Sequence, residues 1–362
     1  MQQKYIWAGL IILLALAGGL AWKSQAPARS NDTITIGVIA PLTGSLAEFG
    51  EAVRNGFTLA NEDLQKQGKQ INFVFEDSAY MPDKAITAYK KLTEFDKVDV
   101  TINWGAPTSE ALVPIAKNST TPFFAFTIVN GFTTENTVIR LLNRPDDFID
   151  VLWPYIRSRG WKKIGIVKSK NQFLDGMYTS LVAAKHADET IVLIDEFQGG
   201  DKDFRTSIQK AKGLELDAIG DFLLSGQVSQ YEKQSKELGL NLPVIGTDFF
   251  DGEKEIAASR GAMEGAVYPH LEASASFKTR YKQRFNNVSQ LGFAGNAYDV
   301  AMIFGTRVNY TSAQTIRASV QATTGYVGTL GHYEYVETPN DRYLKQPVVL
   351  MTVKNGKPEQ LR

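Results

Sequence analysis

From residue 33 onward, runs of β-branched and apolar residues alternate with segments whose apolar positions recur every three or four residues. The run TITIGVIAPL at 33–42 is followed by the segment 49–64, where Val53, Phe57, Ala60 and Leu64 share one helical face. The same criteria predict strands at 70–77, 98–104 and 121–127, and helices at 83–94 and 109–119. Single helices between successive strands predict a parallel sheet built from right-handed crossovers.

The pattern then restarts and predicts a second unit of similar size. Helices are predicted at 146–160, 175–187, 204–214 and 228–240, with strands at 162–169, 190–197, 216–225 and 242–248. The tail has a different character, with helical segments at 276–285 and 295–308 and strands of a final antiparallel piece at 330–337 and 346–356. We therefore predict an α/β protein of two doubly wound parallel-sheet lobes.

Each lobe is expected to be built from two separate segments of the chain. Lobe I is predicted to comprise 31–147 and 272–343, and lobe II to comprise 148–271 and 344–362. Several crossings between lobes form a multi-strand hinge, which suits opening and closing around a ligand. In sheets of this kind the ligand crevice lies at the carboxyl ends of the strands.

The first 30 residues are predicted to direct export. Lys4 precedes an apolar run at 5–22, and a polar, proline-containing stretch follows. This order is typical of a cleaved signal peptide, and the run is also about the length of the shortest membrane span, so an N-terminal anchor remains an alternative. We expect a periplasmic or extracytoplasmic location, either secreted or tethered to the inner membrane. No cysteine follows the run, which excludes the bacterial lipoprotein route.

Composition narrows the classes of function. The chain has 39 basic and 39 acidic residues, so no global field favours nucleic acid or an anionic membrane surface. Three histidines, His186, His270 and His332, lie far apart in sequence, and there is no cysteine. We therefore expect no metal site and no cofactor.

The ordered motifs of the mature chain resemble a known family. ITIGVIAPLTGSLAEFGEAVRNGFTLANEDL, GAPTSEALVPIAKNSTTPFFAF and SKELGLNLPVIGTD occur in the order and at the spacing found in periplasmic leucine/branched-chain amino-acid-binding proteins. These are the solute receptors of ABC importers, with a type I periplasmic binding fold. The resemblance spans essentially the whole mature chain and implies a small-molecule ligand, such as an amino acid, and an ABC permease and ATPase as partners.

The resemblance also implies roles for residues of the first lobe. Thr108 and Ser109 match the family loop that binds the ligand carboxylate, and a helix N-terminus offers unpaired N–H donors for such an anion. Ser109 is alternatively an ordinary N-cap of its own helix, and the two roles are compatible. Thr127, Ile128 and Asn130 match the loop that meets the ligand ammonium, although the family's usual run of small residues is absent there.

Further ligand contacts are expected from aromatic and second-lobe residues. Phe49 and Phe173 stand where the family often has tyrosines, and Trp104 either lines the side-chain pocket or anchors lobe packing. Asp248 matches an acidic residue that pairs with the ligand ammonium from the second lobe, while a solvated turn aspartate is the alternative. Ser225 and Gln227 follow another strand and are candidates for polar contacts.

An enzyme is not expected. The segment GAPTSEA lacks the G-x-S-x-G pattern of a nucleophile elbow, and no histidine follows a predicted strand as its base. The glycine-rich phosphate fingerprints are also missing after the first strands. We predict a solute-binding protein that closes on a small amino acid or amide-like ligand and delivers it to an ABC importer. A membrane-tethered sensory domain on the same fold is the alternative.

Overall fold

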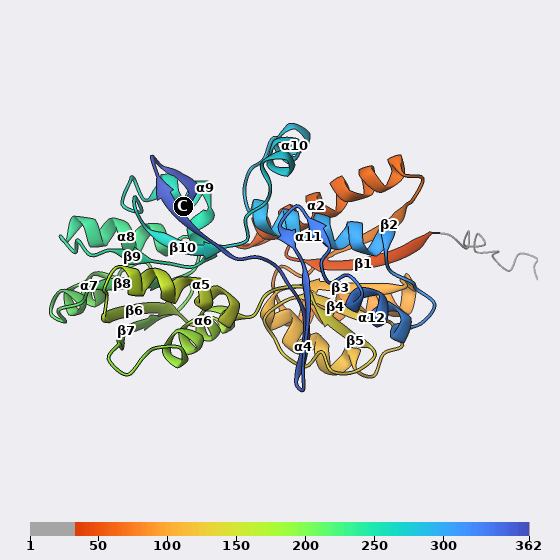
Figure 1. Cartoon of the computed structure of the whole chain (residues 1–362), viewed down its shortest axis with the longest axis horizontal. Helices are drawn as coiled ribbons and strands as arrows, with labels where there is room; N and C mark the ends of the chain where they lie inside the picture. Colours follow the sequence, from red (N-terminus) through yellow and green to blue (C-terminus); the bar gives the residue numbers. More distant parts are fainter. Residues whose placement is uncertain (1–32, 362) are drawn as a thin grey trace, which may run out of the picture. The chain divides into compact units, whose positions relative to one another are not determined.

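The computed structural model describes residues 33–361, and the chain from Ile34 onward forms one compact unit. Figure 1 shows its strands gathered into two separate sheets with helices around them. Each sheet has seven strands, and most neighbours within a sheet are parallel. The predicted α/β fold with two doubly wound lobes is confirmed. The apolar run at 5–22 lies outside the described residues.

The sheet of lobe I has the order β13-β14-β5-β4-β3-β1-β2. All neighbouring pairs are parallel except β13 and β14, which form an antiparallel hairpin. Its central strands are buried throughout, as expected for a parallel sheet covered on both faces. The strands are β1 (Ile34–Ala40), β2 (Ile71–Asp77), β3 (Val100–Trp104), β4 (Phe123–Phe126), β5 (Thr137–Arg140), β13 (Glu334–Thr338) and β14 (Asp341–Lys345).

Helices from both ends of the described chain complete lobe I. Helix α2 packs against α11, and Gly56 permits the contact, because a Cβ there would meet the carbonyl oxygen of Ala294 at 2.2 Å. Phe304 of α11 packs on Phe124 of β4, which explains why most of α11 is buried. The elements are α2 (Ala47–Lys66), α3 (Pro82–Lys90), η1 (Lys91–Phe95), α4 (Ala106–Ala116), α10 (Ala275–Phe285), α11 (Leu291–Thr306), α12 (Ala313–Gln321) and the short strands β11 (Val327–Gly328) and β12 (Gly331–His332).

The sheet of lobe II has the order β16-β15-β10-β9-β8-β6-β7. Strands β6 to β10 are parallel, whereas β15 and β16 add to the edge in antiparallel pairs. The strands are β6 (Lys163–Ser169), β7 (Thr190–Phe197), β8 (Ala218–Phe222), β9 (Val244–Ile245), β10 (Val267–His270), β15 (Val349–Lys354) and β16 (Lys357–Gln360). The helices are α5 (Pro145–Ser158), α6 (Gln172–Ala183), α7 (Arg205–Lys212), α8 (Val228–Glu237), η2 (Asp248–Asp251) and α9 (Glu253–Ala258).

The chain passes between the two lobes three times, after β5, after β10 and after β14. Two of these crossings are joined by a reciprocal amide pair. Asn143 Nδ2 donates to the Gln346 carbonyl oxygen at 2.8 Å, and the Gln346 N–H donates to Asn143 Oδ1 at 2.8 Å. The sheets define which strands pair, not where a domain ends, so the residue limits given above for the lobes stay predictions.

Two sequence-based expectations about elements are wrong. The strands expected at 330–337 and 346–356 do not pair with each other, because β13 pairs with β14 in the first sheet and β15 pairs with β16 in the second. The helix expected to begin at Thr108 and Ser109 begins at Ala106 instead. Gly105 precedes it with a φ of 120°, a conformation that glycine adopts without strain and other residues rarely adopt.

Candidate functional site

A pocket lies where the carboxyl ends of strands from both sheets meet. It encloses about 470 Å³ of space, part of it open to solvent. In lobe I its walls follow β1 to β5, and in lobe II they follow β6 and β9, as expected for crevices of doubly wound sheets. The lining residues are Leu46, Phe49, Tyr80, Trp104, Gly105, Ala106, Phe126, Thr127, Ile128, Leu142, Asn171, Phe173, Asp248, Phe249 and Phe293.

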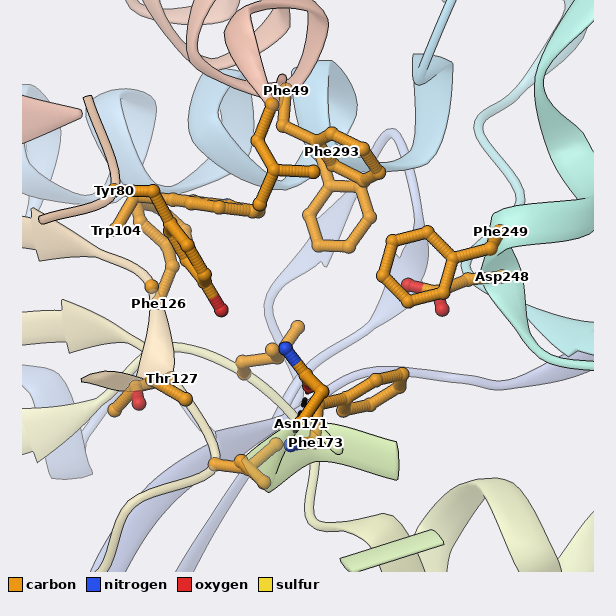
Figure 2. Close-up of a pocket in the computed structure, with 15 residues that line it drawn as sticks. Phe49, Tyr80, Trp104, Phe126, Thr127, Asn171, Phe173, Asp248, Phe249 and Phe293 are labelled. Carbon is orange, nitrogen blue, oxygen red and sulfur yellow. Dashed lines mark hydrogen bonds between the residues drawn. The ribbon is translucent and has the colours of Figure 1, made fainter. Parts of the chain in front are cut away.

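Aromatic rings from both lobes form most of the wall (Figure 2). Phe49 lies at the centre of the cluster, with ring centroids 5.3 Å from Trp104, 5.4 Å from Phe293 and 5.9 Å from Phe249. Phe249 in turn lies 6.2 Å from Phe173. Tilted and edge-on pairs at these separations are favourable arrangements for aromatic rings. The pocket therefore has a mainly apolar interior to which both lobes contribute.

Asp248 is the ionisable carboxyl of this wall. It opens the one-turn helix η2 directly after β9, its side chain is buried, and its Oδ1 has no hydrogen-bond partner among the described residues. Burial raises the pKa of Asp248 to about 6, opposed by the nearby His270. A buried carboxylate oxygen without a partner is costly, so the site is suited to a ligand that brings a donor or a cation.

Tyr80 reaches the pocket from a strained turn. Its φ is 63° and that of the preceding Ala79 is 44°, both in the left-handed region that residues with a Cβ rarely occupy. Asp77 Oδ1 accepts from the Ala79 N–H at 2.8 Å and from the Leu42 N–H at 2.9 Å, which holds the turn against the loop after β1. Figure 2 shows the Tyr80 hydroxyl pointing into the pocket.

The Tyr80 hydroxyl also connects the two lobes. Burial raises the pKa of Tyr80, and interactions with the Asn171 side chain and the Ala106 N–H oppose that rise. Asn171 belongs to lobe II and caps α6 by accepting from the Phe173 N–H at 2.9 Å. Ala106 begins α4 of lobe I. Residues of both lobes therefore meet at this phenol.

The structure brings together six of the eleven residues that the sequence singled out for ligand contact. These six line the pocket: Phe49, Trp104, Thr127, Ile128, Phe173 and Asp248. Arg140 supports one wall from behind, because its guanidinium donates to the Thr127 carbonyl oxygen at 3.4 Å while pairing with the buried Asp341. The pocket loops are thus fixed by contacts inside lobe I.

Thr108 and Ser109 lie outside the pocket lining. Both are fully buried within the first turn of α4. Asn103 Nδ2 donates to Thr108 Oγ1 at 2.9 Å and to Ser109 Oγ at 2.8 Å, and the Ser109 N–H donates to the Gly105 carbonyl oxygen at 3.1 Å. These hydroxyls therefore tie β3 to α4. The residues of this helix start that face the pocket are Gly105 and Ala106.

Asn130, Ser225 and Gln227 are also absent from the lining. Asn130 is exposed, and Ser225 is half-buried in the loop after β8. Gln227 is buried and braces lobe II internally, because its Oε1 accepts from the Ser169 hydroxyl at 2.5 Å and its Nε2 donates to the Gln198 carbonyl oxygen at 2.7 Å. Both ends of the Gln227 amide are therefore hydrogen-bonded within lobe II.

Sequence reasoning missed Tyr80, Asn171, Phe249 and Phe293 as parts of the pocket. Tyr80 and Asn171 each follow a strand, so a search of every strand exit for polar and aromatic residues would have found them. Phe249 adjoins Asp248 and could have been found with it. Phe293 lies in the first turn of α11 and is far from any strand exit in sequence, so no local signal marks it.

One group of metal-ligand residue types lies close together among the described residues, His186 with Asp188 and Glu189. Arg157 Nε donates to Glu189 at 2.8 Å, and Lys162 Nζ donates to Asp188 at 2.6 Å. Both carboxylates are therefore already neutralised by side-chain cations, which disfavours a metal there.

Comparisons with known proteins agree with this architecture. The family model described as periplasmic binding protein matches residues 33–358. The Leu/Ile/Val-binding protein BraC3 of Rhizobium johnstonii is 27% identical over 280 residues, covering 74% of this chain and 73% of that protein.

Solved structures share the fold. LivJ of Streptococcus pneumoniae, a branched-chain amino acid transporter substrate binding protein in complex with isoleucine, has a TM-score of 0.78 at 22% identity, covering 91% of this chain and 99% of its own. An ABC transporter solute binding protein from R. palustris in complex with benzoate has a TM-score of 0.75 at 20% identity, covering 91% and 95%. With a family model that matches nearly all of the described residues, this chain belongs to the periplasmic binding protein family.

Proposed function

We propose that this protein is the solute receptor of an ABC importer and takes a small amine-bearing ligand, an amino acid or an amide-like compound. The main support for this proposal is that Asp248 is a buried carboxylate whose Oδ1 has no partner, in a pocket whose other walls are mainly aromatic. An ammonium group supplies both the charge and the donors that this carboxylate lacks. The ligand's apolar part then displaces water from the rings.

Membership of a solute-binding family supports a binding role without catalysis, and it implies an extracytoplasmic location. Several relatives, BraC3 among them, are named as amino-acid-binding proteins, which supports the ligand class proposed here. No helix within residues 33–361 is long and apolar enough to cross a membrane. Tethering through residues 5–22 concerns a segment outside the described residues.

The proposal is tested by titrating amino acids, their amides and simple amines into the purified protein by calorimetry and thermal shift. Asp248→Asn keeps the shape of the side chain and removes its charge. We expect it to weaken binding by about 30-fold or more, or ~2 kcal/mol, because an ammonium group loses its buried counter-charge. Asp203→Asn, at an exposed carboxylate, is the matched control. Equal affinities in the two variants would contradict the assignment of Asp248, and conversion of a bound ligand would reveal an enzyme.

A further inference from the structure

The Tyr80 hydroxyl is a donor that the described part of the protein leaves unused. Burial raises the pKa of Tyr80, and hydrogen bonds from the Asn171 side chain and the Ala106 N–H lower it, as donors to a phenol oxygen do. Asn171 acts here through its Nδ2, because its Oδ1 accepts from the Phe173 N–H at 2.9 Å as the cap of α6. Both bonds occupy the phenol oxygen and leave its hydrogen free, and this hydroxyl points into the pocket (Figure 2).

A second free donor lies beside the first. The Trp104 Nε1–H is buried and has no hydrogen-bond partner among the described residues. The ring centroids of Trp104 and Tyr80 are 5.9 Å apart, and both residues line the pocket from lobe I. Because a buried N–H without a partner is unfavourable, this side of the pocket is suited to a ligand that brings an acceptor.

Tyr80 is held at this place by a backbone that is itself unfavourable. The φ angles of 44° at Ala79 and 63° at Tyr80 lie in the left-handed region. Such strain persists where surrounding contacts fix it, and it gathers at ligand-binding sites. The contacts come from the side chains just before the turn, since Asp77 Oδ1 accepts from the Ala79 N–H at 2.8 Å and Ser78 Oγ accepts from the Tyr80 N–H at 3.2 Å. The turn thus keeps the phenol directed into the pocket.

The backbone of lobe I also favours a negative group on this side. Helices α2, α4 and α11 each place a residue of their first turn in the lining, namely Phe49, Ala106 and Phe293. The N-terminus of a helix carries a partial positive charge that stabilises a nearby anion. A ligand carboxylate is therefore accommodated here although the lining residues include no lysine, arginine or histidine.

The opposite side of the pocket has the opposite need. Asp248 of lobe II lines it with a carboxylate oxygen that has no partner among the described residues. The charge of Asp248 adds to the burial that raises the pKa of Tyr80, as expected for groups that face each other across one pocket. Free donors on lobe I and a free acceptor on lobe II thus define two ends of the site (Figure 2).

We infer that Tyr80 is a specificity-determining residue whose hydroxyl, with the Trp104 indole N–H beside it, donates to the carboxylate of the ligand while Asp248 binds the amine. This inference rests on the solute-receptor function proposed above and narrows the ligand to an amino acid held at its two ends by different lobes. The hydroxyls of Thr108 and Ser109, which the sequence suggested for the carboxylate, are buried inside the start of α4, so Tyr80 and Trp104 take their place.

Tyr80→Phe tests the assignment, because it removes the hydroxyl and keeps the ring. Leucine with 3-methylbutylamine, and phenylalanine with 2-phenylethylamine, are pairs that share one apolar body and differ in the carboxylate. Each compound is titrated into the full-length protein at pH 7 by calorimetry. We expect the wild type to bind each amino acid at least about 10-fold more tightly than its amine. In Tyr80→Phe the amino acid should weaken by about 10-fold or more and the amine by less than about 3-fold. Tyr178→Phe, at a half-buried phenol of α6 outside the lining, is the matched control and should keep both affinities.

Trp104→Phe tests the second donor. It also removes part of the wall, so both members of a pair should weaken, but the amino acid by about 5-fold more than the amine. Phe49→Leu alters the same wall without removing a donor and should weaken both members alike. Asp248→Asn should also weaken both, because both carry the amine. Thermal unfolding checks that each variant is folded, and the wild-type comparison stands without the variants.

An amino acid that binds Tyr80→Phe as tightly as the wild type would overturn this role of Tyr80 and leave the receptor function intact. Equal weakening of amino acid and amine in Tyr80→Phe would overturn it too, since the hydroxyl would then serve the wall and not the carboxylate. If no compound with an amine binds the wild type, the proposed function itself is wrong.

Discussion

Asp248 is desolvated by burial, and its Oδ1 has no hydrogen-bond partner among the described residues. Burying a carboxylate in this way is unfavourable unless a neighbouring group or a ligand supplies a charge or a hydrogen bond that offsets the cost. The titratable groups that act on Asp248 are His270, Asp251 and Tyr80. His270 favours the ionised carboxylate, and Asp251, which accepts a hydrogen bond from the Tyr268 hydroxyl, disfavours it. The pocket thus holds a carboxyl group whose charge is sensitive to its surroundings.

This sensitivity predicts a pH dependence of binding. Because burial raises the pKa of Asp248 to about 6, the empty site is largely protonated below that pH and largely ionised above it. We expect affinity for an amine to rise as pH increases through about 6 and then to level off. Calorimetry between pH 5 and pH 8 measures this directly. In Asp248→Asn the rise should disappear, and a rise that persists would show that Asp248 is not the group responsible.

At the scale of elements, buried acids do more than line the ligand site. Asp221 of β8 and Glu232 of α8 are buried against each other, and Asp221 Oδ2 and Glu232 Oε1 have no other partner among the described residues. Burial raises the pKa of Glu232 to about 8, and burial together with the neighbouring Glu232 raises the pKa of Asp221 well above its ordinary value. These raised pKa values predict that the neighbouring carboxyls of the strand and the helix hold a proton at neutral pH.

Glu232→Gln tests this pair through stability. In the unfolded chain Glu232 titrates near 4.5 and in the folded chain near 8, so the folded state binds more protons in this window. The free energy of unfolding of the wild type should fall as pH rises from about 4.5 to 8. In Glu232→Gln we expect that fall to shrink by about 1 kcal/mol or more.

Denaturant unfolding at pH 5 and pH 8 provides the measurement. Glu237→Gln, at the exposed end of the same helix, serves as the control and should keep the wild-type fall. An identical pH profile for Glu232→Gln and the wild type would contradict a proton held at this position.

At the start of α4, two hydroxyl residues that were expected to bind a ligand stabilise the packing of the helix on its strand. Asn103, the fourth residue of β3, donates to both hydroxyls of the first helical turn and so fixes the angle between strand and helix. That contact turns Thr108 and Ser109 inward and leaves Gly105 and Ala106 facing the pocket. The Thr108-Ser109 pair, which resembles a ligand-binding loop in sequence, therefore makes a packing contact in the structure.

At the scale of the whole molecule, the three crossings decide how the two lobes can move. The pair between Asn143 and Gln346 joins the first and third crossings, and Asn296 of α11 donates to the Leu141 carbonyl oxygen at 2.9 Å. The first and third crossings are thus bonded to each other, and the first is also bonded to α11 of lobe I. Relative motion of the lobes must be absorbed by the few residues around these contacts.

We expect Asn143→Ala to lower the free energy of unfolding by about 1–3 kcal/mol, because the buried Gln346 N–H and carbonyl oxygen lose their partners. Chemical denaturation measures the loss. Asn241→Ala, at an exposed asparagine of lobe II, is the control and should change stability by less than about 0.5 kcal/mol. Equal effects of the two variants would show that the amide pair does not stabilise the hinge.

The sequence by itself determined the elements and the fold class, because apolar periodicity is a local property of each segment. The runs at β1, β3 and β6 and the stripe of α2 were predicted close to their observed bounds. The short strands β5 and β14 and the edge strand β16 were not, since four or five residues with charged positions carry little periodic signal. Their place depends on neighbours that are distant in the chain.

For the candidate site, too, some residues could be selected from the sequence and others could not. Asp248, Phe49 and Phe173 follow strands or begin helices, so a strand-end rule and family resemblance were enough to select them. Whether Thr108 faces a ligand or Asn103 depends on where α4 begins. With the helix starting at Ala106, two residues before Thr108, the Thr108 hydroxyl contacts Asn103 and does not face the pocket. Only the tertiary structure decided this, because side-chain direction is fixed by contacts between segments.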